Sequence, residues 1–171
     1  MTPIHNKALF LDRDGVINIW AEIWEYITSI QDFRFAPWAL DIIKDITNAI
    51  IPIFVITNQQ CIWKWVVSNE QVNHLHNYME QEIKKYWWKI EAIKVCPHLR
   101  EDACICRKPK PGMILSVLSS YPTLDPAQCL FVWDSESDVE AWKAAWVQTL
   151  YIEKDNIIDA HDQILSFFNK S

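Results

Sequence analysis

Glycine is scarce in this sequence. The 171 residues include two glycines, Gly15 and Gly112, alongside ten tryptophans, whereas average usage would give roughly twelve glycines. No Gly/Ser linker, internal repeat or low-complexity tract is present. The sequence therefore argues against a string of linked domains. It predicts a single domain over residues 1–171, long enough to bury a core without disulfide or metal staples.

Several tryptophans occupy positions where turn chemistry favours glycine. A bulky residue does not readily adopt a positive φ, because its Cβ then crowds the backbone. We therefore expect strained turns wherever tryptophan stands in a tight turn of this chain. The positions concerned are Trp63, Trp65, Trp87, Trp88, Trp133, Trp142 and Trp146.

Long hydrophobic runs and an excess of basic residues are also absent. Half of the residues are hydrophobic, yet no apolar run approaches the length needed to span a membrane. Residues 1–7 lack the apolar core of a secretory signal. A net charge of -6 argues against non-specific binding to nucleic acid. We therefore expect a soluble, cytoplasmic, monomeric protein with neither membrane nor nucleic acid as a partner.

Apolar strand patterns alternate with amphipathic helix patterns along the chain. A capping box of Ser68 and Gln71 marks the start of one helix. Strict alternation of this kind is typical of an α/β protein with a Rossmann-like parallel sheet sandwiched by helices. The expected strands are 8–11, 52–57, 90–95, 129–133 and 147–152, and the expected helices are 38–49, 68–86, 111–120, 136–145 and 160–168.

Two carboxylates follow the first expected strand. Asp12 and Asp14 are two residues apart, so an extended segment presents them on the same side, and Gly15 lets the chain turn sharply behind them. One carboxylate can attack a substrate while its neighbour moves a proton, which is what covalent phosphoryl or acyl transfer requires. The alternative is an Asp-rich turn that caps a helix, and D-x-D-G alone is too short to decide.

Polar residues end two further strands. Thr57 and Asn58 follow one, and Asp134 and Asp138 follow another. Because the carboxyl ends of parallel strands meet at one edge of a sheet, these side chains should gather near Asp12. Acids placed so close together need a cation, and Mg²⁺ is the natural one. Alternatively, Asp134 and Asp138 are acids at a helix N-terminus, which the helix dipole favours.

The densest cationic segment is Arg107-Lys108-Pro109-Lys110. It is the candidate site for an anionic substrate, because the chain as a whole is acidic. Lys108 offers a compact positive charge, and the Thr57 hydroxyl offers a hydrogen bond to a phosphate.

A metal-ligand pattern precedes that segment. Cys96, His98, Cys104 and Cys106 give the spacing C-x-H-x5-C-x-C. Three thiolates and one imidazole make a closed tetrahedral zinc site, which is structural because no coordination position stays open. Disulfides are a poor alternative in a cytoplasmic chain. We therefore predict a zinc loop over about 96–106, which orders the backbone that carries Arg107 and Lys108.

Four segments in this order, 12–15, 57–59, 107–112 and 134–138, resemble the haloacid-dehalogenase superfamily of phosphatases. The resemblance implies a haloacid-dehalogenase-like fold with no large cap domain. It also implies that Asp12 is the nucleophile that forms a phospho-aspartate. Asp14 would protonate the leaving oxygen and later activate water.

The same resemblance implies roles for the remaining residues of the site. Thr57 would hydrogen-bond the transferring phosphoryl group, and Lys108 would offset its charge. Asp134 would join Asp12 and the carbonyl group of Asp14 around Mg²⁺. Asp138 would be a supporting acid or the cap of the following helix.

Within the superfamily, the zinc loop and the run 106–112 resemble the D-glycero-D-manno-heptose 1,7-bisphosphate 7-phosphatases of lipopolysaccharide heptose biosynthesis. This implies a small phosphorylated sugar as substrate, with Asn58, Arg107 and Lys108 in contact with it. Arg107 would hold the second, non-transferring phosphate. Histidinol-phosphate phosphatases share the zinc loop and the D-R-D-G start, so they remain the alternative.

The chain departs from this family at several glycine positions, now Trp24, Cys61, Trp65 and Trp133. We expect the Trp133 indole to block backbone approach to the metal site or to shift its strand, and so to impair activity. Ser135 replaces a lysine that is common in the family.

Two other classes stay open: a zinc-stabilised binding protein that has lost catalysis, and a receiver-like phosphotransferase. The second would not need Asp14. We interpret His74, His76 and His161 as surface or packing residues.

Overall fold

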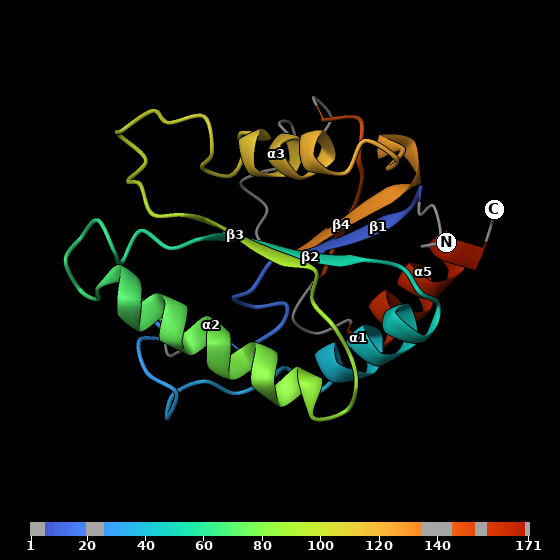
Figure 1. The fold of residues 1–171 in the computed structure, drawn as a ribbon, viewed down its shortest axis with the longest axis horizontal. Coiled ribbons are helices and arrows are strands. Elements are labelled where there is room, and N and C mark those ends of the chain that lie inside the picture. The colour runs from blue at the N-terminus through green and yellow to red at the C-terminus, as the bar shows by residue number, and fades with distance from the viewer. Residues whose placement is uncertain (1–5, 20–25, 135–144, 153–156, 170–171) are drawn as a thin grey trace.

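The computed structural model describes residues 6–19, 26–134, 145–152 and 157–169. They form a five-stranded sheet of order β3-β2-β1-β4-β5 in which every pair is parallel. Figure 1 shows α3 on one face of this sheet and α1, α2 and α5 on the other. The strands are β1 (Ala8–Leu11), β2 (Ile53–Asn58), β3 (Ala92–Cys96), β4 (Cys129–Trp133) and β5 (Gln148–Tyr151). The helices are α1 (Ala39–Asn48), α2 (Asn69–Lys84), α3 (Gly112–Ser120) and α5 (Ile157–Asn169), with a short 3-10 turn at Pro126–Gln128.

The two faces of the sheet are covered by alternate residues of each strand. In β1, Leu9 and Leu11 pack toward α1, α2 and α5, whereas Ala8 and Phe10 pack toward α3. All four are 1% exposed or less, so β1 is buried on both sides. A central parallel strand reads as a continuous apolar run for this reason.

The helices form where apolar spacing and capping coincide. In α2 the Ser68 hydroxyl accepts from the Gln71 N–H at 3.2 Å, and the Gln71 side chain accepts from the Ser68 N–H at 2.8 Å. This confirms the predicted capping box. The helix buries one stripe of residues at 3.6-residue spacing, because that side of the helix faces the sheet. Its buried residues are Val72, Leu75, His76, Met79 and Ile83.

The expected fold class is confirmed, and the elements differ from expectation mainly at their ends. The third strand begins two residues later than expected, at Ala92, and the last helix begins three residues earlier, at Ile157. The helix expected over 136–145 lies largely outside the described residues, as do Trp24, Ser135, Asp138 and Trp142. Over the described residues there is no large cap domain, and no helix has the length and apolarity to cross a membrane.

Three of the tryptophans adopt the backbone conformation that favours glycine. Trp65, Trp87 and Trp146 have φ values of 58°, 64° and 59°. Their side chains are 93%, 93% and 80% exposed, so little packing compensates for the strain. A left-handed conformation costs an L-residue about 1–2 kcal/mol. The expectation of strained turns is therefore confirmed at these three positions.

Restoring glycine at the three positions is expected to stabilise the protein. The variant W65G/W87G/W146G loses the strain but gains some entropy in its unfolded chain, so the net gain is about 2 kcal/mol in total. For a chain of this size that gain raises the Tm by about 4–8 °C. Calorimetry checks this, with W65A/W87A/W146A as the control that removes the indoles but keeps the strain. Equal gains in the two variants would contradict the argument.

Trp133 does not shift its strand. It pairs in register with Tyr151 of β5, and its ring lies 5.5 Å from the Tyr151 ring in the core beneath α3. The expected distortion of β4 is therefore wrong, because the indole packs in the core on the α3 side of the sheet and the hydrogen-bonded pairing of β4 with β5 is intact. The indole is 2% exposed, and its N–H has no acceptor among the described residues. An orphan donor of this kind costs about 1–3 kcal/mol.

Candidate active site

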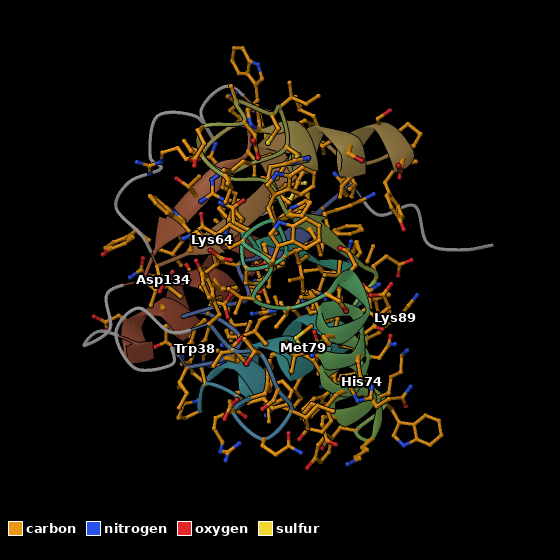
Figure 2. All side chains as sticks on the ribbon, turned by 90° about the vertical axis from the view of Figure 1, so that its left-hand side faces the viewer. Trp38, Lys64, His74, Met79, Lys89 and Asp134 are labelled. Atoms are coloured by element: carbon orange, nitrogen blue, oxygen red, sulfur yellow. The ribbon has the colours of Figure 1, made fainter. Side chains whose placement is uncertain are left out.

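Strand ends bring the predicted polar residues to one edge of the sheet. Asp12 follows β1, and its N–H donates to the Val132 carbonyl of β4 at 3.0 Å. Thr57 is the second-last residue of β2 and lies beside Val95 of β3, and Asp134 follows β4. Figure 2 looks toward this side of the molecule, with Asp134 and the loop residue Lys64 labelled.

A tight turn aims the two acids of the first strand. The Arg13 carbonyl accepts from the N–H groups of Ile17 and Asn18 at 2.8 and 3.0 Å, and the Gly15 N–H donates to the Asn18 carbonyl at 2.8 Å. Gly15 has φ 80°, which strains any residue with a Cβ. The turn therefore depends on one of the two glycines in the chain.

Asp12 is held between a backbone donor and a buried lysine. The Arg13 N–H donates to its Oδ1 at 2.7 Å, and the Lys108 ammonium makes an ion pair with its Oδ2. Lys108 is 6% exposed. Burial raises the pKa of Asp12 above its ordinary value, although the charge of Lys108 opposes this. Lys108 is therefore the group that favours the ionised, nucleophilic form of Asp12.

Asp14 is held by a different cation. The buried Arg13 guanidinium donates to both carboxylate oxygens, from Nη2 at 2.8 and 2.9 Å and from Nε at 3.2 Å. Asn18 and Gln59 add side-chain donors at 3.1 and 2.8 Å. Burial alone would raise the pKa of Asp14, but the charge of Arg13 and these hydrogen bonds outweigh it and lower the pKa. Asp14 is thus held ionised in the free site.

His76 of α2 lies behind Arg13. Its Nε2 is 3.1 Å from Arg13 Nη1, and an arginine only donates, so the imidazole is the acceptor and is neutral. Burial and the neighbouring guanidinium lower the pKa of His76 to about 4. The interpretation of His76 as a surface or packing residue missed this contact. Its place in the apolar stripe of α2 was the available signal, since a polar group there needs a buried partner.

The lowered pKa of His76 predicts pH-dependent stability. The His76 imidazole takes up a proton near pH 6.5 in the unfolded chain, but only near pH 4 in the folded chain. Stability from this group is therefore complete above pH 6.5 and is lost as the pH falls toward 4. Between pH 7 and pH 5 the loss is about 2 kcal/mol. Urea unfolding of wild type, H76Q and the exposed-residue control H74Q at both pH values checks this. A slope in H76Q as steep as in wild type would refute it.

The end of β2 ties the phosphate-binding candidates to the acids. The Gln59 side-chain amide donates to the Thr57 hydroxyl and to Asp14, both at 2.8 Å. Sequence reasoning gave Gln59 no role. The Asn58 amide exchanges two hydrogen bonds with the backbone of Lys108, at 3.0 and 3.1 Å. Asn58 thus holds the Lys108 segment in place, and its contact with substrate stays a prediction.

The four predicted zinc ligands come together. Their ligand atoms, Cys96 Sγ, His98 Nδ1, Cys104 Sγ and Cys106 Sγ, all lie within 4.8 Å of one another. The sulfur pairs are 3.2, 3.4 and 3.7 Å apart. Tetrahedral zinc with bonds of about 2.3 Å would separate two sulfurs by about 3.8 Å. The donor set and its spacing therefore fit a structural zinc ion.

The zinc loop is joined to the catalytic segments on both sides. Arg107 donates to the His98 carbonyl at 2.9 Å and to the Gln60 side chain at 3.2 Å. The Trp63 ring lies 5.0 Å from the His98 ring. At the start of α3, a Cβ on Gly112 would meet the Ile105 carbonyl carbon at 2.8 Å. The second glycine therefore lets α3 pack directly on this loop.

The carboxylates fit Mg²⁺ through their chemistry. Asp12 and Asp134 offer hard oxygen ligands at the ends of adjacent strands. The Asp14 carboxylate faces Arg13, which leaves its backbone carbonyl as the ligand the family resemblance implies. The carboxylates of Asp12, Asp14 and Asp134 outnumber the two cations Arg13 and Lys108, so a phosphate dianion would meet a net negative charge at this edge of the sheet. A divalent cation offsets that excess.

We compared the chain with known proteins. No model of a known protein family matches it. It is 35% identical over 136 residues to the D-glycero-alpha-D-manno-heptose-1,7-bisphosphate 7-phosphatase of Mycobacterium tuberculosis, covering 80% of this chain and 71% of that one. It is 35% identical over 157 residues to the D-glycero-beta-D-manno-heptose-1,7-bisphosphate 7-phosphatase of Rhodopseudomonas palustris, covering 88% and 85%.

A solved structure shares the fold. It is the D,D-heptose 1.7-bisphosphate phosphatase from B. bronchiseptica complexed with magnesium and phosphate, with a TM-score of 0.79 and 24% identity over 93% of this chain and 98% of that one. The Cys/His cluster that fits zinc and the acid pair after β1 are both consistent with this likeness. The chain belongs to the D-glycero-D-manno-heptose 1,7-bisphosphate 7-phosphatase family.

Proposed function

We propose that this protein is a phosphatase that removes the 7-phosphate of D-glycero-D-manno-heptose 1,7-bisphosphate through an aspartyl-phosphate intermediate. The observation that carries the proposal is that the two acids form separate ion pairs, Asp12 with Lys108 and Asp14 with Arg13. Two acids with different cations can take different roles, one as nucleophile and one as proton carrier. We place the activity in the cytoplasm, in a monomer that acts on a small phosphorylated sugar.

The first displacement forms the intermediate. An Asp12 oxygen attacks phosphorus while the bond to the sugar oxygen breaks, and Asp14 delivers a proton to that oxygen. Asp14 is ionised in the free site, but an incoming phosphate places negative charge beside it and favours its protonated form. Lys108 and the Thr57 hydroxyl stabilise charge on the transferring group.

The second displacement regenerates the enzyme. Water attacks the phosphorus of the aspartyl phosphate, Asp14 takes the water's proton, and the Asp12 carboxylate leaves. The hydrogen bonds from Arg13 and Gln59 keep Asp14 oriented through both steps. Bound at Asp12, Asp134 and the Asp14 carbonyl, Mg²⁺ would supply charge neutralisation and orientation of the phosphoryl oxygens.

The substrate class is inferred from Arg107, a cation outside the group of residues assigned to the reacting phosphate. Arg107 extends from the zinc loop toward the β2 end, where it contacts Gln60. A guanidinium has five donors in a planar fork, and this one retains donors for a second phosphate. Family membership supports the heptose bisphosphate, and within the described part of the chain no feature favours histidinol phosphate.

The proposal is tested by comparing substrates. The purified protein with Mg²⁺ should release phosphate from heptose 1,7-bisphosphate with a kcat/KM at least about 100-fold above that for histidinol phosphate, because a charge-assisted contact of Arg107 with the second phosphate is worth up to about 3 kcal/mol. The α and β anomers are assayed separately. Preference for histidinol phosphate would overturn the substrate assignment, and release from neither substrate would overturn the activity.

A further inference from the structure

A histidine outside the acid pair is built into the same buried network. His76 is 5% exposed, Arg13 is 1% exposed, and they touch at 3.1 Å although 63 residues separate them in the sequence. Arg13 directs Nε and Nη2 to Asp14 and Nη1 to His76. Over the part of the chain that the structure describes, these are the two acceptors for this guanidinium. Its plane is therefore defined from both ends.

The orientation of Arg13 sets that of Asp14. A forked donor binds both oxygens of a carboxylate only when the two planes are aligned. If Nη1 lost its acceptor, a buried donor would be left without a partner, which favours rotation of the guanidinium away from Asp14. The effect would reach the phosphate-binding residues, because Gln59 joins Asp14 to Thr57.

We propose, resting on the proposed phosphatase function, that His76 is a positioning residue for the proton transfers of Asp14. Its neutral Nε2 orients Arg13, and Arg13 holds the Asp14 carboxylate at the angle from which it serves the leaving oxygen and the attacking water. Leu75, Met79 and the rest of the α2 stripe anchor the imidazole in the core. The side chain acts through Arg13 and does not touch the substrate.

The test uses two leaving groups, because they separate the two proton transfers. A sugar oxygen needs a proton to leave, whereas p-nitrophenolate leaves without one. In H76L the imidazole is replaced by an apolar side chain that cannot accept a hydrogen bond from Arg13. Hydrolysis of the aspartyl phosphate therefore slows, whereas formation of the aspartyl phosphate from p-nitrophenyl phosphate keeps its rate. For p-nitrophenyl phosphate we expect kcat to fall about 10- to 100-fold and KM to fall with it, so that kcat/KM changes less than about threefold. We also expect a burst of about one p-nitrophenolate per active chain.

Two further variants isolate the hydrogen bond. H76Q places an acceptor near the position of Nε2 and should restore turnover to within about threefold of wild type, with no burst. H76N is polar but too short to reach Arg13, so it should behave like H76L and replaces that variant if the latter does not fold. H74L on the exposed face of the same helix is the control and should match wild type; Figure 2 labels His74 together with the inward-facing Met79.

The outcomes separate this proposal from the function on which it rests. If H76L and H76N match H74L, His76 has no positioning role. If their activity falls equally on both substrates without a burst, His76 serves folding alone and the proposal is again overturned. In both cases wild type still forms a phosphoenzyme. If wild type forms none and D12N retains turnover, the phosphatase mechanism itself is wrong and the role of His76 falls with it.

Discussion

Replacing Asp12 by asparagine is expected to lower kcat for phosphate release by about 10⁴-fold or more. The amide has nearly the shape of the carboxylate but cannot attack phosphorus, so the covalent route closes while the substrate still binds. The effect is this large because Asp14, the other carboxylate of the pair, faces Arg13 and is already engaged by it. Steady-state kinetics measures the loss, and mass spectrometry should find the phosphoenzyme in wild type but not in D12N.

The control for this experiment is D41N, which removes one negative charge from the exposed face of α1, where the Asp41 side chain is 63% exposed. It should leave turnover unchanged. D12N that retains more than about 1% of the wild-type rate would mean that water attacks the substrate directly. The aspartyl-phosphate mechanism would then be abandoned, even with the fold and the family unchanged.

Loss of a zinc ligand is expected to have the second largest effect. Protein purified in zinc-containing medium should hold about one zinc per chain, and C106S should hold little. Binding of structural zinc contributes strongly to folding, so C106S should lose several kcal/mol in free energy of unfolding. Activity should fall by more than about 100-fold, because the ligand is followed directly by Arg107 and Lys108, and a misplaced catalytic group costs about that much. Metal analysis, urea unfolding and kinetics measure the three effects.

C129A supplies the matched control for zinc. Cys129 is buried at the start of β4 and takes no part in the cluster. Its alanine variant should keep the metal and the activity, and any loss of stability should come from packing alone. If C106S keeps its zinc, or loses zinc without losing activity, the loop is not what aims Lys108 at Asp12.

Much of the fold was predictable because its signals are local. The apolar run before Asp12 is a strand buried on both faces, and Ser68 with Gln71 caps α2 as their spacing indicates. The zinc ligands were predictable for a similar reason, since their spacing within one loop limits how far apart they can lie. Element ends were less accurate, because a helix or strand ends where packing and hydrogen bonds to distant segments end.

The partners of the acids were not predictable. Arg13 stands between two carboxylates in the sequence, and nothing local says that it turns away from Asp12 to serve Asp14 and His76. The Lys108 ion pair with Asp12 joins residues 96 positions apart, and Asn58 fixes it through backbone contacts. Such contacts depend on the order of strands in the sheet, which the sequence of apolar patterns leaves open.

The sequence by itself determined the class of fold, the acid pair, the Cys/His cluster that fits zinc and the cost of having few glycines. Tertiary structure decided which cation serves which acid, where Trp133 could be buried, and why Gly15 and Gly112 are needed where they stand. Gly15 holds a positive φ behind the acids, and Gly112 leaves room for the Ile105 carbonyl. The physical reason for this division is range: propensity, capping and ligand spacing act within a few residues, whereas the pKa and orientation of a buried charge depend on whatever the folded chain places beside it.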